Sequence, residues 1–121
     1  MHELSIAYNL VDIASQAAEQ AHAQRVDVVY LRLGRLSGVE KDALLFGYDI
    51  AVKETILEGS RLEIEDVPVT VYCSVCDAVS ELEDIQLFCC PHCGTPTGDI
   101  RQGRELEIIS LEIDNEQSAY S

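Results

Sequence analysis

A chain of 121 residues, of which 47% are hydrophobic and 25% charged, has ordinary globular composition and suits one main core with a small appendage. Its 22 acidic and eight basic residues give a formal net charge of -14, which repels phosphate backbones and anionic membrane surfaces. Nucleic acids and membranes are therefore excluded as expected partners, whereas proteins and metal cations remain. A role of this acidity in solubility alone stays open.

The chain begins with MHELSIAYNL, which contains no basic leader, and no later segment approaches the roughly 18 apolar residues of a membrane span. Its five cysteines cluster between Cys73 and Cys93, which argues against the disulfide framework of a secreted protein. We therefore expect a cytoplasmic protein with reduced thiols.

Two elements are predicted in the first third of the chain. From Leu4 to Ala23, apolar residues recur at steps of three or four, which predicts an amphipathic helix. His22, near its end, is interpreted as structural. The segment from Val26 to Leu33 is rich in β-branched and aliphatic residues and stops before Gly34, which predicts a strand.

A second helix is predicted from a capping box. Ser37 is followed by Glu40, the spacing at which the two side chains satisfy free amide groups at a helix start. We expect the helix to continue to Gly59, a residue suited to the left-handed position after a helix. Gly47 lies within this predicted helix and slightly lowers its stability, because glycine has a low helix propensity.

Two further strands complete the predicted fold. Around Leu62 and Ile64, apolar and charged residues alternate, as in a strand with one buried face. The segment 106–113 is also a strand, in which a change of parity indicates a bulge or burial of both faces. We expect an α+β fold: a small three-stranded sheet with two helices on one face, formed by residues 1–69 and 100–121, and an inserted four-cysteine zinc-ribbon module at 70–99.

The cysteine module has the spacing of a zinc site. Two Cys-x-x-Cys pairs are separated by thirteen residues, and each pair can aim both sulfurs at one ion from a tight turn. Asp77 and Gly94, which follow the two pairs, tolerate the positive φ that such turns require. A segment with so few large apolar residues gains much of its folding free energy from metal. The predicted zinc ligands are Cys73, Cys76, Cys90 and Cys93.

Two nearby donors are interpreted as non-ligands. Using Cys89 in place of Cys90 would widen the spacing and move Pro91 out of the turn position that its fixed φ suits. His92 lies between two ligands, but four cysteines leave no vacant position for it. We expect His92 to be a solvated turn residue.

Other functions share the cysteine pattern. A thiol oxidoreductase also uses Cys-x-x-Cys, but here two pairs occur and neither opens a helix after a strand. A nucleic-acid-binding zinc ribbon normally needs basic residues, and no lysine or arginine lies between Cys73 and Cys93. A zinc-ribbon adaptor that binds proteins and has no nickel role stays an alternative.

The extreme N-terminus gathers donors that suit nickel. Met1, His2 and Glu3 offer a free amine, amide nitrogens, an imidazole and a carboxylate. Divalent nickel accepts such nitrogen and oxygen donors in square-planar or tetragonal geometry. The first amides of a helix have no intrahelical partner, so coordination breaks no helical hydrogen bonds. In the alternative interpretation, Glu3 only complements the helix dipole and His2 is an ordinary exposed residue.

The segments MHELSIA, RLGRLSGV, CPHCG and GRELEIISLEI together resemble the HypA family of hydrogenase nickel-incorporation proteins. The resemblance spans almost the whole chain. It implies a non-enzymatic protein with nickel as transient cargo at Met1, His2 and Glu3 and a structural zinc at the four cysteines. It also implies work with a HypB-type GTPase and nickel transfer to the precursor of the hydrogenase large subunit. Some family members serve urease, so the client stays open.

The oligomeric state also stays open. Exposed apolar residues of the strands would support a homodimer or exchange of elements between chains, and the same residues would serve ordinary core packing.

Overall fold

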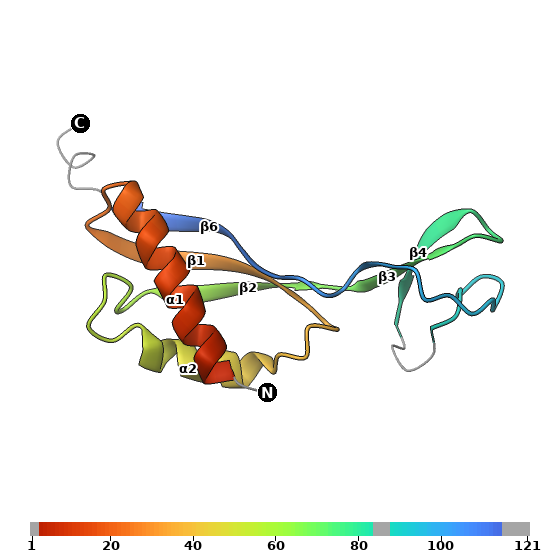
Figure 1. Cartoon of the computed structure of the whole chain (residues 1–121), viewed down its shortest axis with the longest axis horizontal. Coiled ribbons are helices and arrows are strands. Elements are labelled where there is room, and N and C mark those ends of the chain that lie inside the picture. Colours follow the sequence, from red (N-terminus) through yellow and green to blue (C-terminus); the bar gives the residue numbers. More distant parts are fainter. Residues whose placement is uncertain (1–2, 84–87, 115–121) are drawn as a thin grey trace. The chain divides into compact units, whose positions relative to one another are not determined.

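The computed structural model describes residues 3–83 and 88–114, which form two compact units. The first unit contains the chain up to Leu31, Val39–Glu65 and the chain from Glu107; the second contains Arg32–Gly38 and Asp66–Leu106. Neither described helix has the length and apolarity that a membrane span requires. In chain order the elements are α1 (Glu3–Gln20), β1 (Arg25–Gly34), α2 (Lys41–Ala51), β2 (Arg61–Val67), β3 (Val69–Cys73), β4 (Ala78–Leu82), β5 (Ile100–Gln102) and β6 (Leu106–Asp114) (Figure 1).

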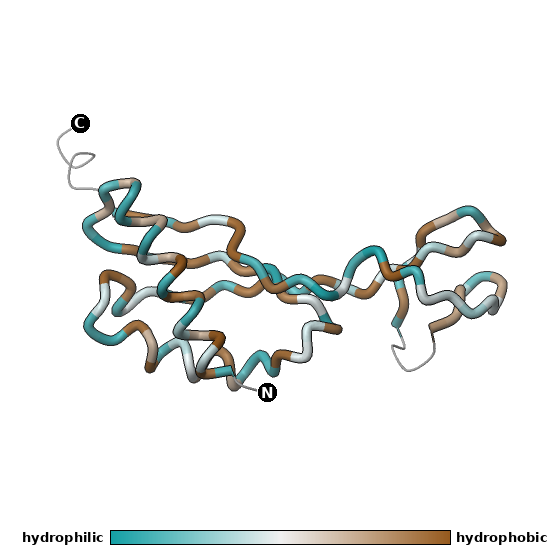
Figure 2. The backbone as a smooth tube through the Cα atoms, viewed as in Figure 1, coloured by the Kyte–Doolittle hydropathy of each residue, from teal (hydrophilic) through white to brown (hydrophobic). Residues whose placement is uncertain are grey.

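The first unit is a three-stranded sheet with strand order β2-β1-β6, and α1 and α2 pack against it. Hydrophobic residues recur along these strands and along α1 (Figure 2). Apolar residues from both helices and from all three strands form one shared core. The predicted α+β fold class is therefore confirmed. The buried residues of α1 are Ala7, Leu10, Val11, Ala14 and Ala18.

His22 lies in the hydrogen-bonded motif that ends α1. This residue has a φ of 59°, and its N–H and that of Ala23 donate to the carbonyls of Glu19 and Ala18 at 3.0 Å. These two bonds form a Schellman motif, which satisfies carbonyls that the helix leaves without partners. His22 therefore serves the end of the helix, as expected.

The predicted second helix is too long at both ends. Glu40, rather than Ser37, is the N-cap of α2: its side chain accepts a hydrogen bond of 2.6 Å from the Ala43 N–H. The helix ends at Ala51, with Val52 as C-cap, and turns follow up to Gly59. The Thr55 hydroxyl lies within these turns and donates to the Val52 carbonyl at 2.6 Å. The turns still bury Leu57, so the apolar pattern continues where the helix does not.

The interpretation of β6 as a strand is confirmed, but burial of both its faces is wrong. Ile108 and Leu111 pack against the core of the first unit, whereas Leu106, Ile109 and Ile113 are between 36% and 49% exposed. The strand lies at the edge of the sheet next to β1, and Ile108 and Leu111 are the side chains through which it joins the core of the first unit.

The second unit contains a sheet that was not predicted, with strand order β4-β3-β5. β3 and β4 form an antiparallel hairpin from the pair Val69 and Leu82 to the pair Cys73 and Ala78. Its small core consists of Val69, Val71 and Leu82, with Leu36, Phe88 and Ile100 packed against it. The predicted domain limits, with residues 70–99 as the zinc-binding module, stay a prediction.

Within the second unit, two glycines allow a close approach of two backbone segments. A Cβ atom on Gly34 would lie 2.1 Å from the carbonyl oxygen of Gly103, far inside contact distance. Gly103 has a φ of 128°, which favours glycine. The Leu36 N–H donates to the Gly103 carbonyl at 2.6 Å, and the Gly34 N–H donates to the Glu105 carbonyl at 2.7 Å.

Candidate metal centre

The four predicted zinc ligands lie on two tight turns. Cys73 ends β3, and Cys76 lies in the turn that leads to β4. In the second turn the Gly94 N–H donates to the Cys90 carbonyl, and the Cys90 N–H donates to the Thr95 carbonyl, both at 2.8 Å. Asp77 and Gly94 have φ values of 50° and 76°, so the predicted positive φ is confirmed in both turns.

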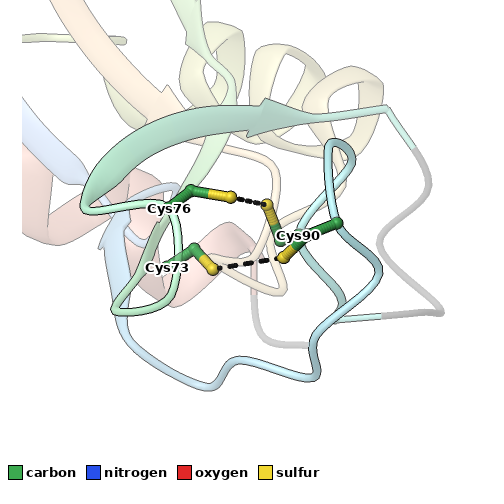
Figure 3. Close-up of side chains that lie close together, drawn as sticks. Cys73, Cys76 and Cys90 are labelled. Carbon is green, nitrogen blue, oxygen red and sulfur yellow. Dashed lines mark hydrogen bonds between the residues drawn. The ribbon is translucent and has the colours of Figure 1, made fainter.

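The sulfurs of these two turns converge on one point (Figure 3). Cys73 Sγ and Cys93 Sγ lie 3.6 Å apart, Cys76 Sγ and Cys90 Sγ lie 3.9 Å apart, and all four lie within 4.8 Å of one another. A tetrahedron with zinc–sulfur bonds of about 2.3 Å has edges of about 3.8 Å. The cluster therefore has the donors and the size of a four-thiolate zinc site.

Each turn contributes one buried and one exposed thiol. Cys73 and Cys90 are both 2% exposed, whereas Cys76 and Cys93 are exposed to solvent. All five cysteines are free thiols, so no disulfide competes with a metal for the sulfurs. The cluster thus lies at the surface of the second unit, open to an ion from one side.

Hydrogen bonds set the protonation of the cluster. The Thr95 hydroxyl lies 3.0 Å from Cys93 Sγ and, with the Thr95 backbone N–H, lowers the pKa of Cys93 to about 6. Hydrogen bonds to the sulfurs of Cys93 and Cys90 raise the pKa of Cys76 to about 12. Four neighbouring thiols cannot all ionise without a compensating charge. A divalent cation supplies that charge, so the cluster favours metal binding.

A set of side chains next to the cysteines braces the first turn. The Tyr72 hydroxyl donates to the Asp77 carboxylate at 2.6 Å, which ties together the residues on either side of the Cys73–Cys76 pair and raises the pKa of Tyr72. The Arg101 guanidinium lies 4.7 Å from the centre of the Tyr72 ring and donates twice to Asp99 at 2.9 Å. Sequence reasoning missed Tyr72, Asp99 and Arg101, and it predicted Asp77 only for its backbone conformation; the only local signal for the hydrogen bond was that Tyr72 and Asp77 flank the cysteine pair.

The two residues predicted as non-ligands lie outside the cluster of four sulfurs. Cys89 is half-buried and forms an isolated β-bridge with Pro96, and His92 is exposed. Both line an open cavity of about 570 Å³, together with β4 residues and Pro91.

The predicted nickel site is described only in part. Met1 and His2 lie outside the described residues. Glu3 begins α1 and is half-buried, and its Oε2 accepts a hydrogen bond of 3.0 Å from the backbone N–H of Glu40. The Glu3 carboxylate, one of the donors that the N-terminal segment offers, therefore has a protein partner at the start of α2.

The fold and the cysteine cluster agree with a comparison of the sequence with known families. Residues 1–113 match the family described as "Hydrogenase/urease nickel incorporation, metallochaperone, hypA". The chain belongs to the HypA family. The family resemblance predicted from the sequence motifs is thereby confirmed, and HypA proteins are metallochaperones for hydrogenase maturation.

Several HypA-family relatives are similar over nearly the whole chain. The hydrogenase maturation factor HypA of Roseiflexus sp. (strain RS-1) is 55% identical over 116 residues, which cover 96% of this chain and 94% of the relative. The hydrogenase maturation factor HybF of Klebsiella pneumoniae is 39% identical over 112 residues, covering 93% and 98%. The solution structure of the Ni metallochaperone HypA from Helicobacter pylori has a TM-score of 0.67 at 25% identity and covers 96% of this chain and 100% of that chain.

Proposed function

We propose that this protein binds Ni(II) at its N-terminus and delivers it during maturation of nickel–iron hydrogenase, while a zinc ion stabilises its second unit. The observation that carries the proposal is the family match over residues 1–113, combined with four cysteine sulfurs within 4.8 Å of one another. In this proposal nickel is the cargo, zinc is resident, and neither metal performs catalysis.

The nickel site consists of Met1, His2 and Glu3. The terminal amine, the His2 amide and the His2 imidazole close adjacent chelate rings around one ion, and Glu3 supplies a fourth donor. The start of α1 at Glu3 supports this arrangement, because the first amides of a helix have no intrahelical acceptors. Copper binds such donors at least as tightly as nickel, so selectivity depends on metal supply and on partners.

The zinc site consists of Cys73, Cys76, Cys90 and Cys93. Four thiolates complete a tetrahedron and leave no open position for a substrate, which is the property of a structural site. The small core of the second unit, with three fully buried apolar residues, supports a role of zinc in its folding. The zinc ion and its ligands hold the two turns together.

The proposed partners are a HypB-type GTPase and the precursor of the hydrogenase large subunit, in the cytoplasm. The relatives named as hydrogenase maturation factors support a hydrogenase client. The family description also names urease, which makes urease maturation proteins a second candidate destination for the nickel.

Nickel titration tests this proposal. Zinc-loaded protein that begins at Met1 should bind one Ni(II) in a calorimetric titration and retain its zinc throughout. The His2→Ala variant should lose tight nickel binding. A zinc-ribbon adaptor without a nickel role would instead show the same weak nickel binding in both proteins, and that result would refute the proposal.

A further inference from the structure

β4 is an edge strand of the sheet in the second unit, where the strand order is β4-β3-β5. The hydrogen bonds of β3 show which backbone groups of β4 face the free edge. The Tyr72 N–H donates to the Asp99 carbonyl at 2.9 Å, and the Tyr72 carbonyl accepts the Thr97 hydroxyl at 2.6 Å. The backbone groups of Tyr72 therefore face away from β4. Because these groups alternate sides along a strand, those of Val71 and Cys73 face β4.

The register of the hairpin carries this alternation into β4. Val71 pairs with Ser80, so the N–H and carbonyl of Ser80 face β3. The backbone groups of its two neighbours, Val79 and Glu81, then face the free edge of the sheet. In the part of the chain that the structure describes, these outward groups have no backbone partner. They offer two donors and two acceptors to another strand.

The open cavity of about 570 Å³ lies along this edge. Five consecutive residues, 79–83, line it together with residues 89–92. Since successive side chains point to opposite faces, a cavity lined by all five follows the edge of the strand. The Arg35 guanidinium ends the free edge, because it donates to the Glu83 carbonyl at 3.2 Å. An extended segment of three residues spans roughly 10 Å and can form four hydrogen bonds with Val79 and Glu81.

The charges around the cavity select the strand that can bind there. The carboxylates of Glu81 and Glu83 are exposed, and no lysine or arginine lies between Cys73 and Cys93. A zinc ion with four thiolates is also net negative, and one of these thiolates belongs to Cys90 in the cavity wall. A basic strand is therefore attracted. The β4 strand of a second copy would instead bring like carboxylates together.

We propose that the free edge of β4 binds an extended basic segment of a partner protein, which adds an antiparallel strand to the β4-β3-β5 sheet. Directly opposite residues have their side chains on the same face, so a lysine or arginine lies opposite Glu81. An apolar side chain lies opposite Val79, which is 54% exposed. Antiparallel pairing sets the order in the partner: a basic residue, any residue, then an apolar residue. The inference concerns the second unit alone and does not rest on the proposed nickel site.

Hydrogen exchange of the zinc-loaded protein, followed by NMR, tests the pairing. In the free protein the amides of Val79 and Glu81 should exchange rapidly, and that of Ser80, which faces β3, should be protected. The probe is the acetylated and amidated peptide Thr-Arg-Thr-Val-Thr at about ten times its measured Kd. Exchange of the two outward amides should then slow about 10-fold, while that of Ser80 stays unchanged.

Charge reversal tests the recognition by Glu81. Glu81→Lys should bind this peptide roughly 3- to 10-fold more weakly, because an attractive cross-strand pair becomes a repulsive one. The peptide Thr-Glu-Thr-Val-Thr should show the opposite preference, with weak binding to the wild type that Glu81→Lys restores. Glu58→Lys makes the same change of net charge in the first unit, and its affinity for both peptides should stay within about 2-fold of the wild type.

Three results would overturn the proposal. The first is that the arginine peptide does not bind, or binds without slowing exchange at Val79 and Glu81. The second is that Glu81→Lys retains its zinc but shows no change of preference between the two peptides. The third is protection of the outward amides that grows with protein concentration in the absence of peptide, which would assign this edge to a second copy. If Glu81→Lys loses its zinc, exchange in the wild-type protein decides alone.

Discussion

Replacing Gly34 by alanine should severely destabilise the second unit. The φ of Gly34 is not positive, so alanine is compatible with its backbone, and the cost comes from the new Cβ. That atom would lie 2.1 Å from the Gly103 carbonyl oxygen, and the two segments must separate by roughly 1 Å to restore van der Waals contact. This movement stretches the Gly34–Glu105 and Leu36–Gly103 backbone hydrogen bonds of 2.7 and 2.6 Å. Two hydrogen bonds at about 1 kcal/mol each, with added backbone strain, give a loss of about 2–4 kcal/mol.

Gly98→Ala is the matched control for Gly34→Ala. Gly98 belongs to the same unit, its φ is not positive, and a Cβ there would meet no atom within 4 Å. We expect its effect to stay within about 0.5 kcal/mol. Chemical unfolding of the zinc-loaded proteins measures the loss of stability in both variants, and zinc release to a chelator reports on the second unit. If Gly34→Ala unfolds and releases zinc like Gly98→Ala, the close approach does not constrain the sequence and the reasoning is wrong.

Four further predictions concern the metal sites. Zinc stoichiometry should fall in each single alanine variant of the four clustered cysteines, because the closed tetrahedron loses a thiolate, whereas Cys89→Ala should retain zinc. If Cys89→Ala loses zinc and Cys90→Ala retains it, the ligand assignment is wrong. His2→Ala should bind nickel weakly but keep its zinc content and melting temperature, and residues added before Met1 should also impair nickel binding by converting the amine into an amide. If the native, His2→Ala and extended proteins bind nickel with equal affinity, the metal donors lie elsewhere. Thr95→Val removes the hydroxyl that lies 3.0 Å from Cys93 Sγ and helps to lower the pKa of the Cys93 thiol to about 6, so this pKa should rise in the variant. Zinc would then displace more protons, and zinc affinity should fall more steeply from pH 8 to pH 6 than in the wild type; parallel slopes would refute this role. Nickel affinity should fall over the same pH range before zinc is lost, since histidine and the α-amino group titrate at about 6.5 and 7.7–8.0; a pH-independent affinity would exclude the amine and amide donors.

The local features of this protein could be predicted because they depend on neighbouring residues. The periodicity of α1 and the alternation in β2 each reflect one element with one buried face. The β-branched run of β1 reflects a strand that buries most of its apolar residues. The turns at Asp77 and Gly94 follow from the spacing of the cysteines and from the few residues that tolerate positive φ. The four-cysteine cluster was predictable for the same reason, since two Cys-x-x-Cys turns can each aim two sulfurs at one ion.

Features that depend on distant contacts were decided by the tertiary structure. The sequence pattern continued past Ala51, but turns bury Leu57 without continuing α2. The β3–β5 pairing joins residues about thirty positions apart, and no local pattern marks such a pairing. The hydrogen bond between Glu3 and Glu40 and the contact between Gly34 and Gly103 likewise join segments that only packing brings together. Composition and spacing therefore determined which metal donors the chain offers. Long-range contacts decided that one of them, the Glu3 carboxylate, already accepts a hydrogen bond from another part of the chain.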